Sequence, residues 1–563
     1  MIENKILKEC AELIDEYKKY GLIIIYGYKG IGETVQEYFM YNYNTMRSSA
    51  YNCKVKYFAT SFKNYEVSEG TREVKGVPIH YIGDLQEYSD EALVIVATRE
   101  SDQADVLNVL NSFHFKNVVC VSKQLYTKLK IENRKISGEL RLEVMQYSLN
   151  HQIKLELLRE KVSRNEKINV IFMSHTAATF GCKSLYDALE KSPIFMPYIM
   201  PFERKEKVFS NWKELLEENC CRFKSQGYRV LEAYEGDYLV DMERYEPDII
   251  FIDYPNFFLK GATTQVINDI LSWKYLTCYV PYGCIMANSF YYHYEAINTR
   301  KFWKFFLDTR YSFKRSISEA DFNGGNTVLS GYPKLDEYFI ENSESNFPKK
   351  LNNGKPIVIY APHWSIGMSN NYATFNLYND IFLELAKNNP DINFVFKPHP
   401  LLESRIHRLN EQKKVNSQIY EKYKDLMTYQ EYIQYVSTWG NLPNGVVMTG
   451  GDYIELFKMS SCMITDSGSF IGEYLLSGRP CIYLINPDKP RPFEGYTEVA
   501  QKILEQYYLC YNEEEIISSF NEVVLNGNDY KSEGRKQVIE SDFVNLGCAG
   551  KFICEYLEKE LKG

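Results

Sequence analysis

The amino-acid sequence predicts an α/β protein made of several Rossmann-like domains, in which parallel strands alternate with helices. Short apolar runs that favour strands recur along the chain, for example at residues 22–26 and 168–173, and helical segments separate them. Small polar or glycine-containing turns follow these runs directly. One stretch, residues 461–487, contains a strand, a turn, a helix and a second strand in immediate succession. These three observations together indicate doubly wound parallel sheets.

The stretch 461–487 reads SCMITDSGSFIGEYLLSGRPCIYLINP, and its turn, DSGS at 466–469, is the strongest local signal. Ser467 or Ser469 is expected to cap the following helix, so that free backbone N–H groups and the helix dipole form an anion site suited to a phosphate. Glu473 lies about one turn inside that helix, where its carboxylate could reach the ribose hydroxyls of a nucleotide. An ordinary turn with Glu473 facing solvent stays open as the alternative.

Length and composition limit the classes of protein to which the chain can belong. The chain has 563 residues, enough for about three or four domains, and 45% of them are hydrophobic, which suits packed cores. The net charge of −9 argues against a general nucleic-acid binder, which needs a basic face. The 13 cysteines are odd in number and form no C-x-x-C pair, so neither a disulfide framework nor a zinc site is expected.

The location that the sequence predicts is the cytoplasm. The cysteine usage suits a reducing compartment, and the first 20 residues read as a charged amphipathic helix rather than a signal peptide. No apolar run approaches the length that spans a bilayer, so membrane contact would be peripheral, at the inner face of the cell membrane.

The first predicted domain covers residues 1–127 and carries the turn GYKGIG after the strand at 22–26. A dinucleotide site needs a glycine where Lys29 stands and an acid at the end of the second strand, which instead ends in Ala59, Thr60 and Ser61. A structural or regulatory module is therefore favoured over NAD binding. The phrase GVPIHYIGDL at 76–85 resembles part of the N-terminal domains that precede some bacterial sugar-transfer and sugar-modifying enzymes.

Residues 128–167 are charged and lack proline, which predicts a linker of one or two helices. A dimerising coiled coil is less favoured because heptads are not sustained. The second domain is predicted over 168–345. Three of its strands are followed by His175, Asp253 and Tyr282. These side chains are expected to face a common binding cleft, because ligands bind at the carboxyl ends of parallel strands.

The third domain is predicted over 346–530, with strands at 356–361, 392–396, 445–448, 462–465 and 481–485. A helical tail, 531–563, is expected to cross back to the preceding domain. Unusual side chains follow consecutive strands of the third domain. They are His363 and Ser365 after the first strand, Lys397 and His399 after the second, and Asp466, Ser467, Gly468 and Ser469 after a later one.

This constellation fits a nucleoside diphosphate donor that is held without a metal. Lys397 can neutralise phosphate charge, His399 can donate to or protonate the leaving oxygen, and the turn at 467–469 supplies N–H donors. A satisfied structural histidine is the alternative for both His363 and His399.

Four segments resemble those of the CDP-glycerol glycerophosphotransferases, the teichoic-acid polymerases and primases, in order and spacing. They are GYPKLD (331–336), IVIYAPHWS (357–365), FVFKPHP (394–400) and ITDSGSFIGEYLLSGRPCIYL (464–484). The resemblance covers roughly residues 168–530 and implies a GT-B type pair of Rossmann-like domains, preceded here by the separate N-terminal domain. The turn and helix at 466–473 also resemble UDP-N-acetylglucosamine 2-epimerases, in which Glu473 matches the ribose-binding acid.

The resemblance implies transfer of glycerol phosphate from CDP-glycerol to a hydroxyl of a polymer or lipid-linked acceptor, with release of CMP and with no metal or other cofactor. His399 matches the family's histidine. The family's histidine-glycine motif corresponds to Tyr282 and Gly283, and tyrosine is a poor base at neutral pH, so the base is expected to be His175 or Asp253.

Other functions stay open from the sequence. A nucleotide-sugar transferase for polysaccharide synthesis would use the same site, and a non-catalytic scaffold of a capsule-assembly complex would explain the missing histidine at Tyr282. An oxidoreductase rests on the GYKGIG turn alone. A homo-oligomer is also left open.

Overall fold

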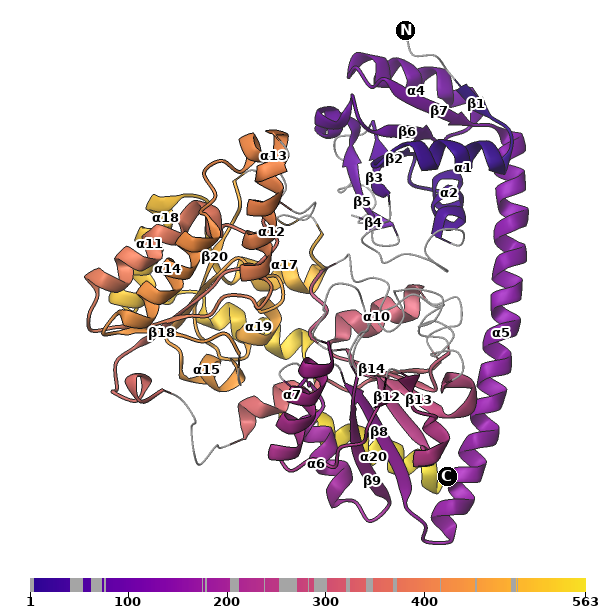
Figure 1. Ribbon diagram of the computed structural model, residues 1–563. Coiled ribbons are helices and arrows are strands. Elements are labelled where there is room, and N and C mark those ends of the chain that lie inside the picture. Colours follow the sequence, from indigo (N-terminus) through magenta and orange to yellow (C-terminus); the bar gives the residue numbers. More distant parts are fainter. Residues whose placement is uncertain are drawn as a thin grey trace.

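In its described part, the computed structural model contains three large, predominantly parallel β-sheets flanked by helices, and one long helix runs from the first sheet to the second (Figure 1). It describes residues 5–40, 54–61, 73–74, 77–174, 176–177, 180–202, 212–236, 238–252, 271–281, 283–287, 301–319, 325–340, 348–367, 372–415, 417–450, 453–487, 493 and 495–563.

The first sheet has the strand order β1-β7-β6-β2-β3-β5-β4, in which only β4 runs antiparallel to its neighbour. Taken from β2, this is the 3-2-1-4-5 order of a Rossmann fold, extended by β1 at one edge. Its strands are β1 (Lys5–Leu7), β2 (Ile23–Tyr26), β3 (Val55–Thr60), β4 (Glu73–Val74), β5 (Val77–Tyr81), β6 (Leu93–Val96) and β7 (Asn117–Val121). Helices α1 (Cys10–Lys19), α2 (Ile31–Phe39) and α4 (Glu100–Ser112) and the 3₁₀ helix η3 (Ile82–Tyr88) accompany them.

The glycines of the GYKGIG turn pack α2 closely against β2. A Cβ on Gly32 would lie 1.7 Å from the carbonyl oxygen of Gly27, which itself has φ +102°. The N–H of Gly30 donates to Oε2 of Glu33 at 3.0 Å, so an acid of the same helix occupies the position that a pyrophosphate would take. This geometry favours the structural interpretation of the turn.

A single helix, α5 (Lys123–Ser163), spans 41 residues where the sequence left one or two helices open. Ser122 caps it by accepting the N–H of Leu125 at 3.1 Å. Near one end Asn133 donates to the carbonyl of Thr34 on α2, and near the other Lys161 forms an ion pair with Asp248 beside the second sheet. Figure 1 shows α5 running along one side of the molecule, from the first sheet to the second.

The second sheet is wholly parallel, with the order β15-β14-β13-β12-β8-β9. A parallel bridge between Ile199 and Val230 places a further segment beside β9. The strands are β8 (Ile168–Ser174), β9 (Phe195–Pro201), β12 (Ile249–Ile252), β13 (Leu276–Tyr279), β14 (Lys304–Leu307) and β15 (Thr327–Leu329), with the hairpin β10 (Tyr234–Glu235) and β11 (Tyr238–Leu239). The associated helices are α6 (Lys183–Lys191), α7 (Trp212–Ser225), η4 (Met242–Tyr245), α10 (Arg310–Glu319) and η7 (Pro333–Phe339).

The third sheet is also parallel and has the order β18-β17-β16-β19-β20-β21. All of its strands run the same way, but successive strands are added on one side of β16 up to β18 and on its other side from β19 onward. Its strands are β16 (Ile357–Ala361), β17 (Asn393–Phe396), β18 (Gly445–Val447), β19 (Cys462–Thr465), β20 (Cys481–Leu484) and β21 (Tyr508–Cys510). The helices are α11 (Phe375–Asn388), α12 (Leu402–Val415), α13 (Ser417–Lys422), α14 (Tyr429–Asn441), α15 (Tyr453–Met459), α16 (Ile471–Leu475), α17 (Glu498–Glu505) and α18 (Glu513–Phe520), and a π-helical turn, η9 (Asn521–Leu525), follows α18. The short 3₁₀ helix η8 (Lys349–Leu351) precedes β16. The second and third sheets with their helices thus form a pair of Rossmann-like domains, as the sequence predicted.

The tail forms α19 (Ser532–Asp542) and α20 (Ala549–Lys562), and α20 returns to pack on α6 beside the second sheet, as the sequence predicted (Figure 1). Asp336 fixes the start of α20 by accepting the N–H groups of Ala549 at 2.9 Å and Gly550 at 2.8 Å. Gly331, with φ +78°, leaves room for the Val544 carbonyl, which would lie 2.4 Å from a Cβ there. The apolar side chains of α20, Ile553, Leu557 and Leu561 among them, are therefore buried in the core. In the described part of the chain, helices lack the combined length and apolarity needed to cross a bilayer.

Candidate functional site

The candidate site lies at the point where the strand order of the third sheet reverses, between β16 and β19. His363 and Ser365 follow β16, Lys397 and His399 follow β17, and the DSGS turn follows β19. Since β17 and β19 both pair with β16, the three segments leave the sheet side by side at its carboxyl edge. Open α/β sheets bind ligands in such a crevice.

Asp466 joins the two sides of this crevice. Its Oδ1 accepts the backbone N–H of His363 at 2.6 Å, and its Oδ2 accepts the N–H of Thr374 at 2.5 Å and the Thr374 hydroxyl at 2.9 Å. The carboxyl is fully buried, and this burial raises its pKa to about 6 against the opposing effect of those hydrogen bonds. The sequence predicted a donor-binding residue here, whereas both oxygens are used to position the His363 loop.

The imidazole rings of His363 and His399 lie together, with centroids 5.4 Å apart. The Nδ1 of His363 accepts the N–H of Ser365 at 3.3 Å, and the Nδ1 of His399 accepts the N–H of Leu401 at 3.1 Å. An acceptor nitrogen carries no proton, so each neutral ring presents its proton at Nε2.

Burial keeps both rings neutral at physiological pH. It lowers the pKa of His363 to about 3 and that of His399 to about 4, and the Lys397 ammonium adds to the effect on His399. Ser365 helps to fix the orientation of the His363 ring. Its buried hydroxyl lies 2.9 Å from Nδ1 of His363 and accepts the N–H of Tyr372. The site thus offers two N–H donors that carry no charge of their own.

Two lysines, Lys334 and Lys397, are buried beside these rings, with 6% and 8% of their surface exposed. Their Nζ atoms lie 4.4 Å and 6.0 Å from the ring centre of Tyr453 on α15. Burial, together with the charge of Lys334, lowers the pKa of Lys397 to about 8. The pair makes this part of the crevice strongly electropositive.

Lys334 and Tyr453 are site residues that the sequence analysis missed. Lys334 stands in the GYPKLD segment that carried part of the resemblance, and that segment was the available signal. In the same segment Gly331 and Asp336 serve the packing of the tail, so the motif has both a structural and a site role.

Glu473 is 3% exposed and lies close to Gly283 of the second domain. Its carboxylate shares a hydrogen bond with the Tyr453 hydroxyl and is attracted by Lys334, while burial raises its pKa. A Cβ on Gly283 would lie 3.7 Å from its Oε1, and the Tyr338 hydroxyl donates to its backbone carbonyl at 2.8 Å. The interpretation in which Glu473 faces solvent is therefore wrong.

The DSGS turn is built differently from the expectation. Helix α16 begins at Ile471 and has Phe470 as its N-cap, so the prediction that Ser467 or Ser469 caps it is wrong. The N–H of Ser467 donates instead to the Thr465 hydroxyl at 3.0 Å, which tightens the turn around the buried Asp466. Gly468 is half-buried and Ser469 is exposed, so these two residues form the accessible part of the turn.

Three residues predicted for the acceptor side, His175, Asp253 and Tyr282, lie outside the described residues. The neighbouring Gly283 belongs to a described segment, 283–287, that contacts the third domain. In this segment the Met286 carbonyl accepts the N–H of Thr497 at 2.9 Å, and Asp308 holds the segment by accepting the N–H of Ile285. The second domain therefore meets the site through this segment.

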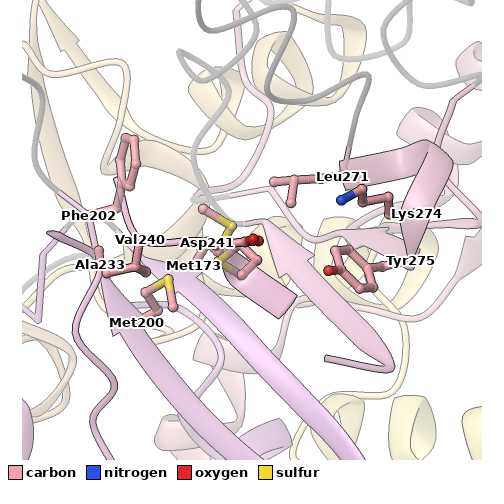
Figure 2. Close-up of a pocket in the computed structure, with 10 residues that line it drawn as sticks. Met173, Met200, Phe202, Ala233, Val240, Asp241, Leu271, Lys274 and Tyr275 are labelled. Carbon is pink, nitrogen blue, oxygen red and sulfur yellow. The ribbon is translucent and has the colours of Figure 1, made fainter. Parts of the chain in front are cut away.

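A small apolar pocket of about 170 Å³ lies in the second domain, near the carboxyl ends of β8 and β9. Met173, Met200, Met242, Phe202, Val240 and Leu271 supply much of its lining. Figure 2 shows Lys274 and Tyr275 on the side opposite Ala233, Val240 and Met200. The sequence did not predict this pocket, because its lining residues come from five separate segments and form no local motif. Across the residues that the structure describes, three or more His, Cys, Asp and Glu side chains nowhere gather as metal ligands would.

Comparisons with solved structures give distant likenesses. The putative UDP-N-acetylglucosamine 2-epimerase from Listeria monocytogenes has a TM-score of 0.43 and 16% identity, covering 70% of this chain and 97% of that chain. The UDP-GlcNAc 2-epimerase from Neisseria meningitidis, bound to UDP-GlcNAc, has a TM-score of 0.43 and 14% identity, covering 70% and 100%. The wall teichoic acid polymerase TagF has a TM-score of 0.43 and 14% identity, covering 75% and 98%.

Among curated proteins there is no significant match. The family model that matches is that of the CDP-glycerol:poly(glycerophosphate) glycerophosphotransferases, over residues 294–540. This region contains Lys334, both site histidines, Lys397 and the DSGS turn. Residues 294–540 of this chain thus match the model of the CDP-glycerol:poly(glycerophosphate) glycerophosphotransferase family.

Proposed function

We propose that the protein transfers glycerol phosphate from CDP-glycerol to a hydroxyl group of a cell-surface polymer precursor, of the teichoic-acid or capsular type, and releases CMP. The observation that carries the proposal is the pairing of two buried lysines, Lys334 and Lys397, with two neutral imidazoles in one crevice. The cysteine usage suits a reducing compartment, so the proposal places the protein in the cytoplasm, with any contact to the inner face of the membrane peripheral.

The charges of the crevice suit a diphosphate. Lys334 attracts the buried carboxylate of Glu473, but two buried ammonium groups in one place are costly in the ligand-free protein, and an anionic ligand would offset that cost. The Nε2–H groups of His363 and His399 add two donors to phosphate oxygens. In this proposal Glu473 lies at the nucleoside end of the donor, and Gly468 and Ser469 supply further polar contacts to its phosphates.

The proposed reaction is an in-line displacement at the phosphorus that carries glycerol. The acceptor oxygen forms a new P–O bond while the P–O bond to CMP breaks, and the electron pair of that bond leaves with CMP. The second pKa of a phosphate monoester is near 6, so CMP leaves readily without a proton. A neutral His399 therefore acts by hydrogen bonding to the leaving oxygen, and Lys397 and Lys334 neutralise its growing charge.

The acceptor is proposed to bind on the side of the second domain. His175 or Asp253 would take the proton of its hydroxyl, with Tyr282 and Gly283 close by. The apolar pocket around Met173 and Met200 is a candidate for an apolar portion of a lipid-linked acceptor, because flexible methionines adapt to such groups.

Ligand binding by the full chain tests the donor class. Calorimetric titration with CDP-glycerol is expected to give clear binding that Lys334→Met weakens and that Lys349→Met, a change of an exposed lysine, leaves intact. Release of CMP on addition of a polymer acceptor then tests transfer. Binding of UDP-sugars in place of CDP-glycerol would replace the proposal by a sugar transferase. Failure to bind any nucleotide would favour a scaffold.

A further inference from the structure

Segment 283–287 of the second domain packs closely on the helix of the third domain that carries Glu473. A Cβ on Gly472 of this helix, α16, would lie 2.7 Å from Cε of Met286 and 3.1 Å from Cβ of Cys284. A glycine is therefore required where the segment approaches the helix. This close approach lies directly beside the Glu473 carboxylate in the chain.

The same segment reaches the DSGS turn through Tyr496. Ala287 pairs with Tyr496 in an antiparallel bridge between the two domains. A Cβ on Gly468 of the turn would lie 3.2 Å from the Tyr496 ring. The Tyr496 hydroxyl lies 2.6 Å from that of Tyr483, which donates to the backbone carbonyl of Asp466 at 3.2 Å. The segment thus contacts both parts of the third domain that are proposed to hold the donor.

Asp308 fixes this segment within the second domain. It follows β14, is 1% exposed, and accepts the N–H of Ile285 at 2.9 Å through Oδ2. Its Oδ1 accepts the N–H of Thr309 at 2.9 Å, and the Ser312 hydroxyl also donates to the carboxylate. Because both oxygens accept hydrogen bonds from buried groups, the carboxylate is held in one orientation and Ile285 is held with it.

Cys284 lies between the anchor and the donor site. Burial raises the pKa of its thiol, and the charges of Asp308 and Glu473 add to this effect, so both carboxylates lie near it. Thr309, next to Asp308, pairs with Phe543 of the tail in another antiparallel bridge. Contacts therefore run without a break from the tail through Asp308 and the segment to the donor site.

We propose that Asp308 is a positioning residue for the transfer, which sets the acceptor side of the crevice against the bound donor through segment 283–287. The inference rests on the proposed function, in which the acceptor binds beside Gly283. Lys334, Lys397 and both site histidines hold the donor from other segments, so donor affinity does not depend on Asp308. The approach of the acceptor oxygen to phosphorus does depend on it, and a displacement of about 1 Å lowers such a rate about a hundredfold.

Asp308→Asn tests the kinetic part of the proposal. An amide nitrogen would face the N–H of Ile285 or of Thr309, so the segment loses a hydrogen bond. Turnover, measured as CMP release with acceptor present, is expected to fall about ten- to hundredfold, because the acceptor is no longer held in place. The dissociation constant of CDP-glycerol, measured by calorimetric titration, is expected to stay within about threefold of the wild-type value.

Asp248→Asn is the matched control. Asp248 is a largely buried carboxylate of the same domain and accepts the N–H of Asn169 at 2.7 Å, but it lies at the amino end of the second sheet. Its replacement also removes an acceptor from a backbone N–H and should leave turnover unchanged. A general loss of stability in the second domain would affect both variants, whereas a positioning role affects only Asp308→Asn.

Amide hydrogen exchange tests the anchoring without any substrate. The amides of 283–287 are expected to exchange at least about tenfold faster in Asp308→Asn and at the wild-type rate in Asp248→Asn. A wild type that transfers nothing would contradict the proposed function, whereas wild-type exchange in Asp308→Asn would contradict the anchoring alone.

A milder variant decides the question if circular dichroism shows that Asp308→Asn does not fold. Ser312→Ala removes one hydrogen bond to the carboxylate and retains its charge, and it is expected to change turnover and exchange in the same directions by about two- to fivefold. The proposal would be overturned by wild-type turnover or exchange in the variant that folds, by an equal loss of turnover in Asp248→Asn, or by a loss of donor affinity as large as the loss of turnover.

Discussion

The backbone N–H of His363 donates to Oδ1 of Asp466 at 2.6 Å and so connects the loop after β16 with the turn after β19. The second oxygen of the same carboxylate holds Thr374, so one buried side chain fixes three segments around the crevice. The position of His363 in space is therefore decided by a residue 103 positions later in the chain.

Asp466→Asn is expected to lower the free energy of unfolding by about 1–3 kcal/mol, because an amide nitrogen would face a backbone N–H and leave it unpaired. Binding of CDP-glycerol should weaken as well, since the His363 loop loses its anchor. Urea unfolding and calorimetric titration measure the two effects. Asp391→Asn, a change of a carboxylate that is 96% exposed, is the control and should alter neither. Equal stability of the two variants would contradict the anchoring role.

His399→Ala is expected to lower turnover at least about a hundredfold, because the leaving phosphate loses a preorganised donor. His407→Ala removes an exposed histidine of α12 and should leave turnover unchanged. The measurement is the rate of CMP release from CDP-glycerol with acceptor present. Wild-type rates in the His399 variant would exclude this ring from the reaction.

Lys334→Met is expected to weaken donor binding about ten- to hundredfold through the loss of a charge-assisted contact. The stability of the ligand-free protein should change less than the affinity, because the removal of one buried ammonium is offset by the loss of its attraction to the buried Glu473 carboxylate. A large loss of affinity with a small change of stability identifies a binding residue rather than a structural one. A loss of stability without loss of affinity would make Lys334 structural.

The stability of the ligand-free protein is expected to fall as the pH drops below about 6.5, since the unfolded chain then binds protons at three histidines, His151, His363 and His399, whose pKa is lower in the folded state. Between about pH 7.5 and pH 5 this amounts to about 1–2 kcal/mol per histidine. Asp466 acts in the opposite sense between about pH 4 and 6, because its folded pKa is raised.

Replacing the rings of His363 and His399 isolates their contribution to this pH dependence. In the double variant His363→Asn, His399→Asn the free energy of unfolding should fall less on acidification, and the fall that remains should be that of His151, opposed by Asp466. Urea unfolding at a series of pH values measures the slopes. Identical slopes for wild type and double variant would show that the two rings titrate normally.

Gly331→Ala is expected to destabilise the protein at least about 2 kcal/mol more than Gly354→Ala. Both glycines have nearly the same φ, +78° and +77°, so both substitutions carry the same backbone cost. An added Cβ meets the Val544 carbonyl at 2.4 Å in the first case and nothing within 4 Å in the second. Similar stabilities of the two variants would show that the backbone at Val544 moves away from an added Cβ at little cost.

The buried strands could be predicted because their apolar runs are long and bounded by turns, and β19 was predicted with its observed limits, 462–465. Strand β1 could not, because Lys5–Leu7 lies in a charged segment and pairs with β7, more than a hundred residues away. Its strand conformation depends on tertiary pairing rather than on local preference.

The site residues that local patterns revealed are those next to strand ends, such as His399 and Lys397. The burial of Lys334 escaped prediction because it depends on Tyr453 and Glu473, which reach it only when the third domain is folded. The use of Asp466 as an anchor likewise depends on Thr374, 92 residues earlier. Contacts of this kind, between residues far apart in the chain, depend on the tertiary fold and produce no periodic pattern in the sequence.

The docking of α20 on α6 has a consequence for biosynthesis. The hydrophobic core of the domain that begins at Ile168 includes Ile553, Leu557 and Leu561. The ribosome must therefore translate nearly 400 residues after Ile168 before this core is complete. While the third domain emerges, the second exposes an apolar surface on α6 that nothing yet covers. Nascent chains of this protein should therefore depend on chaperones for longer than their order of domains suggests.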